Sequence, residues 1–186
     1  EESFEVQTKI KVTKQVEIQS ALEAAASAGV EIVHKRHYRE YDVYFSFDDP
    51  AQGRLRYRED EFVDEDDNVE KVRSRLTLIG QASKEEFKED VLLSRSRYLA
   101  PATNSLRFYR EYFKPASETI IQKDRKRWLV KFQGTELYIN FDQFDKPDLG
   151  NFIEVKARTW SHKDAKRKAE MTSELLEALK LKTEET

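Results

Sequence analysis

The chain has 186 residues, which suits a single domain, and 38% of its side chains are hydrophobic while 37% are charged. The absence of cysteine excludes disulfides, cysteine-ligated zinc and thiol catalysis. A net charge of −3 lacks the basic excess typical of nucleic-acid binders, and no apolar run is long enough to cross a membrane. We therefore expect one cytoplasmic domain over residues 1–186, without a nucleic-acid or membrane partner, and the oligomeric state stays open.

The first third of the chain predicts two strands with a helix between them. Residues 4–12 alternate between apolar and polar side chains, which is the period of a strand. A stripe of apolar residues then recurs at helical spacing, with Thr13 as a possible cap and Gly29 as the expected C-terminal stop. Residues 30–47 are rich in Val, Tyr and Phe, so we expect a second strand there.

The middle of the chain predicts further strands around an acidic loop. Residues 54–58 alternate again, and residues 71–79 form the next strand. Nearly every residue over 59–68 is acidic or polar, so we expect a loop between these strands. A short strand is expected over 85–93, and apolar residues at helical spacing predict a helix over 98–113.

The last third predicts a hairpin, a strand and a closing helix. Residues 117–132 and 136–144 read as two strands joined by a turn at Gln133-Gly134. The final strand is expected over 152–158, and Ser161 caps a helix that runs to about residue 179. Strands dominate and a few helices accompany them, so the predicted fold class is α+β.

The charged faces of these strands carry an unusual excess of one sign. Three rows consist only of Lys or Arg: Arg54, Arg56 and Arg58; Lys71, Arg73 and Arg75; Lys123, Arg125 and Arg127. Each row alone would fit a solvated sheet face. Like charges that face one another across strands destabilise a sheet, however, and a bound polyanion would offset the repulsion. A barrel with a charged bore and helices on its apolar outer face satisfies this pattern, and arginine forks suit phosphate.

Several segments, in order along nearly the whole chain, resemble the CYTH, or triphosphate tunnel, family. That family includes class IV adenylyl cyclases, thiamine triphosphatases and inorganic tripolyphosphatases. The similar segments are Glu5-x-Gln7-x-Lys9 (ExExK in the family), Tyr41-Asp-Val-Tyr-Phe45 (D-x-Y-F), Leu55-Arg-Tyr-Arg58 (L-R-x-R), Arg75-Leu-Thr77 (K-L-T), Lys123-x-Arg125 (K-x-R) and Leu149-Gly-Asn-Phe-Ile-Glu154 (L-G-x-F-x-E).

The resemblance implies a closed antiparallel β-barrel of about eight strands with flanking helices, a bound small-molecule triphosphate or polyphosphate, and Mg²⁺ (or Mn²⁺). The residues it implies for the triphosphate are Lys9, Arg56, Arg58, Arg73, Arg75, Lys123, Arg125 and Lys156. The residues it implies for the metal are Glu5, Glu86, Asp142 and Glu154. The residues it implies for catalysis are Glu5, Glu154 and Lys9.

The sequence departs from the family pattern where the family usually has further acids. Gln7 replaces the second carboxylate of ExExK, and Lys88 and Lys156 each stand where an E-x-E strand would end in Glu. The leading hypothesis is a Mg²⁺-dependent triphosphatase acting on tripolyphosphate or on a nucleoside or other organic triphosphate. The alternatives are a module that binds triphosphates or nucleotides with weakened catalysis, and a class IV adenylyl cyclase, for which the sequence identifies no adenine contacts.

Overall fold

In the computed structural model, ten strands form one antiparallel sheet in the order β5-β6-β1-β10-β9-β8-β2-β3-β4-β7. The structure describes residues 4–13, 17–79, 82–83, 91–95 and 97–181. The strands are β1 (Phe4–Val12), β2 (Val30–Ser46), β3 (Arg54–Val63), β4 (Val69–Ile79), β5 (Ala82–Ser83), β6 (Val91–Arg95), β7 (Arg97–Pro101), β8 (Ser117–Phe132), β9 (Thr135–Lys146) and β10 (Gly150–Thr159). The α+β class is confirmed.

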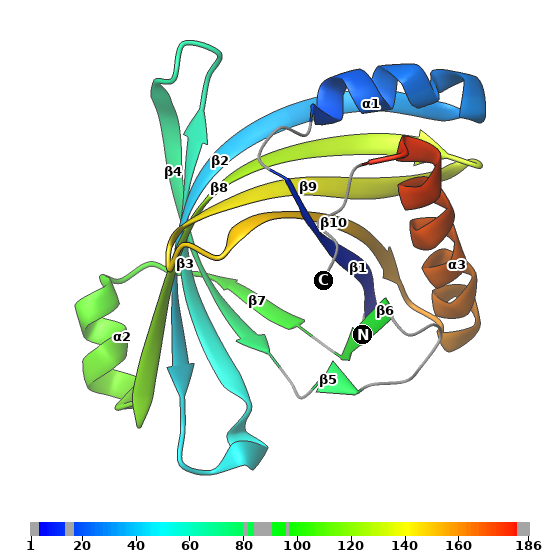
Figure 1. Ribbon diagram of the computed structural model, residues 1–186. Helices are drawn as coiled ribbons and strands as arrows, with labels where there is room; N and C mark the ends of the chain where they lie inside the picture. The colour runs from blue at the N-terminus through cyan, green and yellow to red at the C-terminus, as the bar shows by residue number, and fades with distance from the viewer. Residues whose placement is uncertain (1–3, 14–16, 80–81, 84–90, 96, 182–186) are drawn as a thin grey trace.

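The sheet curls strongly but does not close through hydrogen bonds. Its two outermost strands, β5 and β7, are not paired with each other in the described part of the chain. The chain nevertheless passes from Arg95, the last residue of β6, to Arg97, the first residue of β7, through a single residue. Figure 1 shows the sheet bending so that these edge strands come round toward one another. The prediction of a closed barrel is therefore wrong in closure, because alternation specifies a strand's faces and not its edge partners.

Helices cover the outer face of the sheet (Figure 1), and the apolar side chains between the helices and the sheet are buried. Helices α1 (Ile18–Ala24) and α3 (His162–Leu179) pack on the outer face of the long strands. The core beneath them includes Leu22, Trp128, Ile139, Ile153 and Leu175, all nearly inaccessible to solvent. A second core under α2 (Leu106–Phe113) contains Val43, Phe45, Leu55, Tyr57 and Tyr109. Apolar burial thus lies outside the curved sheet, and the inner face is left for polar side chains.

The helix boundaries follow local capping. Gly29 ends the first helical segment at φ 87°, a left-handed conformation that favours glycine. The first helix starts after Glu17, so the predicted cap at Thr13 is wrong. Ser161 caps α3 as predicted, since its hydroxyl accepts a hydrogen bond from the backbone N–H of Asp164. Within the described chain, no helix combines the length and apolar character of a membrane-crossing segment.

The predicted turn between β8 and β9 is confirmed. Gln133 and Gly134 both have positive φ angles, 51° and 75°, as a two-residue hairpin loop with the right twist requires. This tight turn fixes the register of the two strands, so Arg125 lies directly opposite Asp142.

Two segments differ from the prediction. The acidic stretch is a loop only over its second half, because β3 continues to Val63 and pairs with both β2 and β4. Residues 97–101 are strand and not helix, because they add to the free edge of β4. Helix α2 is correspondingly shorter than expected. In the segment predicted as a short strand over 85–93, residues 84–90 lie outside the described residues, and β6 begins at Val91.

Candidate functional site

The curved inner face of the sheet encloses a cavity of about 240 Å³. Its lining alternates along each strand with the buried outer core, as a period of two dictates. Eight of the lining side chains are cationic: Arg56, Arg58, Arg73, Arg75, Arg125, Arg127, Lys156 and Arg158. Only three are acidic, namely Glu5, Glu40 and Asp60. The bore therefore carries a net positive charge, although the chain as a whole is negative.

Two arginines are held in the bore by paired hydrogen bonds to buried carboxylates. Arg58 donates from Nε and Nη2 to the two oxygens of Asp42, at 2.6 and 2.7 Å. Arg125 donates in the same way to Asp142, with both distances 2.7 Å. In each case the partners are directly opposite on neighbouring strands. This fork-to-fork geometry fixes the guanidinium planes, so both arginines are preorganised before any ligand arrives.

Glu40 lies between three of these cations. Its carboxylate is 3.2 Å from Arg58, 3.4 Å from Lys123 and 3.5 Å from Arg125. Burial alone would raise the pKa of Glu40, but Arg125, Arg58 and Lys123 together hold that pKa well below its usual value. Burial lowers the pKa of Lys123, and Arg125 adds to that effect. Glu40 is therefore ionised, and the cations around it stabilise its charge.

Asp60 accepts hydrogen bonds from two arginines on the neighbouring strand β4. Its Oδ2 atom accepts hydrogen bonds from Arg73 and Arg75, at 2.9 and 2.7 Å. The carboxylate is almost completely buried, whereas Arg73 is partly exposed. Burial lowers the pKa of Arg75 despite the attraction of Asp60. Asp60 was missed at the sequence level because it belongs to the acidic stretch that was predicted to be a loop.

Arg127 lines the bore without a carboxylate partner among the described residues. Its Nε donates to the side-chain oxygen of Asn140 at 2.7 Å, and its guanidinium lies 4.9 Å from the ring centre of Tyr138. No carboxylate of the described residues lies within ion-pair distance of it. Burial lowers the pKa of Arg127, and the neighbouring Arg125 lowers it further. Arg127 is thus suited to bind an anion. The alternation of residues along this strand, which continues past Arg125, is the sequence pattern that places Arg127 on the inner face.

Glu5 and Glu154 both contact Lys156. The Lys156 ammonium is 3.0 Å from Oε1 of Glu5 and 3.0 Å from Oε1 of Glu154. Asn140 also donates to Glu154, at 3.1 Å. Burial would raise the pKa of Glu154, but Lys156 and then Arg125 hold it far below its usual range. Glu154 is therefore ionised, and both carboxylates face a shared resident cation, Lys156.

The structure brings most of the predicted site residues together, but not all. Lys9 is exposed and does not line the cavity, since its ammonium packs against the rings of Phe144 and Phe152 at 5.2 and 4.9 Å. Lys123 does not line this cavity; its ammonium lies 3.4 Å from Glu40 and 3.9 Å from Asp142. Glu86 lies outside the described residues.

The carboxylates that the family resemblance implies for Mg²⁺ or Mn²⁺ do not form a metal site in the described residues. In that part of the chain there is no group of three or more acidic or histidine side chains that could hold a metal ion. Asp142 is bound through both oxygens by Arg125, while Glu5 and Glu154 face Lys156. A divalent ion prefers oxygen ligands free to approach to about 2.1 Å, so these side chains do not fit it as arranged.

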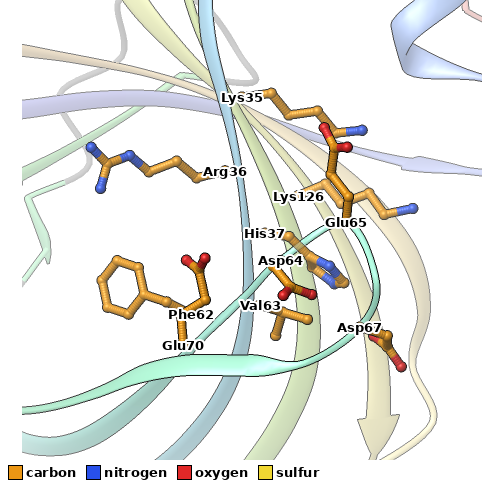
Figure 2. Close-up of a pocket in the computed structure, with 10 residues that line it drawn as sticks. All are labelled: Lys35, Arg36, His37, Phe62, Val63, Asp64, Glu65, Asp67, Glu70 and Lys126. Carbon is orange, nitrogen blue, oxygen red and sulfur yellow. The ribbon is translucent and has the colours of Figure 1, made fainter.

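A larger cavity of about 780 Å³ lies elsewhere, beside the β3–β4 hairpin. Figure 2 shows that acidic and basic side chains share its walls. Four carboxylates line it, against two lysines, one arginine and one histidine. His37 bonds to Asp124 at 2.6 Å, and Asp64 accepts hydrogen bonds from the backbone of its own turn. This balance of charge does not favour a polyanion, so the bore is the better candidate.

Several solved structures of other proteins share this fold over nearly the whole chain. The PH1819 protein from Pyrococcus horikoshii OT3 superposes with a TM-score of 0.69 at 19% identity, covering 96% of this chain and 92% of that one. A "putative adenylate cyclase" from Vibrio parahaemolyticus gives 0.56 at 16% identity, covering 98% and 94%. The Mimivirus capping enzyme triphosphatase gives 0.52 at 11% identity, covering 97% and 89%.

No family model matches the sequence, and no curated protein is detectably similar to it. At identities below a fifth, the structural neighbours establish the fold and not the activity. Two of these neighbours are named a "putative adenylate cyclase" and a triphosphatase, activities found in the family that the sequence resembles. The resemblance read from the sequence is confirmed at the level of the fold, which this chain shares with these solved structures.

Proposed function

We propose that the chain binds a triphosphate-bearing small molecule, inorganic tripolyphosphate or a nucleoside triphosphate, inside the bore. The observation that carries this proposal is the lining of the 240 Å³ cavity by eight cationic side chains against three acidic ones. Cations forced together on the inner face of a sheet repel one another, and a polyanion between them lowers that cost. The larger cavity beside the β3–β4 hairpin, with its balanced charge, offers no such gain.

The arginines are suited to a chain of phosphates because they approach from several strands. Arg56 and Arg58 come from β3, Arg75 from β4, and Arg125 and Arg127 from β8. Planar guanidinium groups donate two hydrogen bonds to one phosphate, and groups already fixed by carboxylates lose little side-chain entropy on binding. We expect Arg127 to make the strongest new contact, because Asn140 and not a carboxylate holds it.

A second candidate is hydrolysis of the bound triphosphate. It is favoured by the structural likeness to the Mimivirus capping enzyme triphosphatase and by the dense positive charge, which would stabilise charge that develops on the transferred phosphoryl group. Glu5 and Glu154 are the carboxylates in reach of the bore that could orient a water molecule. A Mg²⁺-dependent form of this reaction requires them to leave Lys156, and Lys9 is not among the residues that line the cavity.

The test is a ligand panel with separate readings of binding and chemistry. The protein is mixed with tripolyphosphate and with ATP, each with and without Mg²⁺, and the melting temperature, phosphate release and cyclic AMP are followed. We expect both ligands to raise the melting temperature, since a ligand that binds only the folded state stabilises it. Phosphate release would establish hydrolysis, and cyclic AMP would establish a cyclase.

A matched pair of arginine variants locates the effect. Arg127→Met removes a cation from the bore, whereas Arg107→Met removes an exposed arginine from α2 on the outside of the sheet. We expect the first variant to lose the stabilisation by tripolyphosphate and the second to keep it. Binding that is absent in the wild type, or equally affected by both substitutions, contradicts the proposal.

A further inference from the structure

The two departures at Gln7 and Lys156 are partners in the sheet. Strands β1 and β10 are antiparallel, and their register places Gln7 directly opposite Lys156. Glu5 is a diagonal neighbour of Lys156 across the strands, and Glu154 is two residues before it on the same face of β10. A lysine opposite a neutral side chain is not drawn to its direct partner, so its ammonium can reach both acids.

The ammonium lies between those acids as a shared counterion. It is 3.0 Å from one oxygen of Glu5 and 3.0 Å from one oxygen of Glu154, and all three side chains are largely buried. Two ionised carboxylates that face the same point in a buried site repel each other strongly unless a cation separates them. Lys156 supplies that cation from the chain itself.

Other buried acids on the inner face of the sheet are also paired with cationic side chains. Arg125 takes both oxygens of Asp142, and Arg58 takes both oxygens of Asp42. Glu40 is divided among three cations. These inner-face carboxylates therefore already pair with Lys or Arg side chains of the chain itself. A divalent ion that entered here would be repelled by those nearby positive charges.

We propose that Lys156 is a built-in cation that takes the place of a divalent metal between Glu5 and Glu154, so that the bore captures its polyphosphate ligand without a metal. This inference rests on the proposed function for its ligand. It adds that a bound phosphate contacts the cationic side chains directly, with no metal bridge to the carboxylates of β1 and β10.

The experiment measures metal binding and ligand binding separately. Mn²⁺ alone is titrated into the wild type and into Lys156→Gln, and the free ion is followed by electron paramagnetic resonance. We expect no Mn²⁺ uptake by the wild type. We expect uptake by Lys156→Gln, because the substitution leaves Glu5 and Glu154 facing each other without their cation. Lys163→Gln, at an exposed lysine of α3, is the matched control and should behave like the wild type.

The ligand arm uses tripolyphosphate and the wild-type chain in calorimetry, with either EDTA or Mg²⁺ present. We expect EDTA to leave the affinity unchanged or improved, since Mg²⁺ also competes for free tripolyphosphate. An affinity that falls about tenfold or more in EDTA overturns the inference, as does Mn²⁺ uptake by the wild type. If tripolyphosphate binds in neither buffer, the proposed function is contradicted instead. The Mn²⁺ titration still tests the role of Lys156 in that case. If Lys156→Gln does not fold, the two wild-type measurements decide alone.

Discussion

Arg125 and Asp142 face each other across β8 and β9 as a complete fork-to-fork pair, with both N–O distances 2.7 Å and almost no exposure of either side chain. The pair has a structural consequence for the bore. Asp142 positions the guanidinium of Arg125, and both of its oxygens are used in doing so. A carboxylate in that role supports phosphate binding indirectly, through the arginine it holds.

The pair predicts a large loss of stability when Asp142 is neutralised. In Asp142→Asn, the buried Arg125 loses its paired acceptors, and breaking a buried ion pair in this way costs about 3–5 kcal/mol. For a chain of this size we expect the melting temperature to fall by about 10 °C or more. Thermal unfolding followed by circular dichroism measures the effect. Asp145→Asn, on the same strand but exposed, should change little, and equal losses in the two variants would contradict the assignment.

Neutralising Asp60 should strengthen ligand binding. Its carboxylate is one of the three acidic groups that line the cavity, and it forms ion pairs with Arg73 and Arg75. In Asp60→Asn the side chain keeps its shape, while the net positive charge of the lining rises by one. We expect tripolyphosphate to bind about fivefold more tightly, or by about 1 kcal/mol, as measured by calorimetry.

The control for that variant is Glu61→Gln, which makes the same kind of change on the opposite face of β3. Its affinity should match that of the wild type. Weaker binding in Asp60→Asn would mean that Asp60 holds the arginines in their binding positions, and it would count against the view that the acid mainly offsets their charge.

The inner face of the sheet could be predicted from alternation alone. A period of two places Arg56 and Arg58 on one face of β3, and Arg73 and Arg75 on one face of β4, and the structure puts all four in the cavity. The same period also assigned Lys9 to the inner face. Lys9 packs beside Phe144 and Phe152 and is not among the residues that line the cavity, so its role stays a prediction. Parity specifies the face of a strand and not the depth along it.

The carboxylates were harder to predict because their burial is a tertiary property. Asp60 sits in a run of acids that resembles a solvated loop, and only its pairing with β4 reveals that it is buried against arginines. Glu40 has no local signal at all, since its three cationic partners come from β3 and β8. Composition and spacing along one segment do not contain such contacts.

Binding through Arg56 should depend on salt. Arg56 is buried in the cavity lining, where it contacts the hydroxyl of Thr77 at 3.4 Å. Loss of a charge-assisted contact in Arg56→Ala should weaken tripolyphosphate binding by about 1.5 kcal/mol, or roughly tenfold, at low salt. The difference from the wild type should shrink as the Debye length falls from about 30 Å at 0.01 M to about 3 Å at 1 M salt. Calorimetry at both concentrations measures it, and a penalty independent of salt would contradict an electrostatic role. Arg107→Ala is the control outside the bore.

The start of α3 should contribute stability that depends on pH. Asp164 accepts hydrogen bonds from Thr159 at 2.7 Å and from Arg167 at 2.9 Å, and it pairs with Lys168 at 3.0 Å. Burial would raise the pKa of Asp164, but the hydrogen bonds from Thr159 and Lys168 outweigh it and lower the pKa from 3.8 to about 2. A carboxyl whose pKa is lower in the folded state stabilises the fold above its unfolded pKa, and this contribution is lost as the pH falls through its folded pKa.

Asp164→Asn should therefore destabilise the chain by about 1 kcal/mol at neutral pH, a value typical of a charge at a helix N-terminus. The gap between wild type and variant should be constant down to about pH 4 and should close as the pH falls from there toward 2, because the wild-type carboxyl becomes protonated. Urea unfolding at pH 7, 4 and 3 measures the gap. Glu170→Gln, at an exposed position of the same helix, should show little difference at any of these pH values. A gap for Asp164→Asn that widens in acid would show that these contacts do not favour the ionised form.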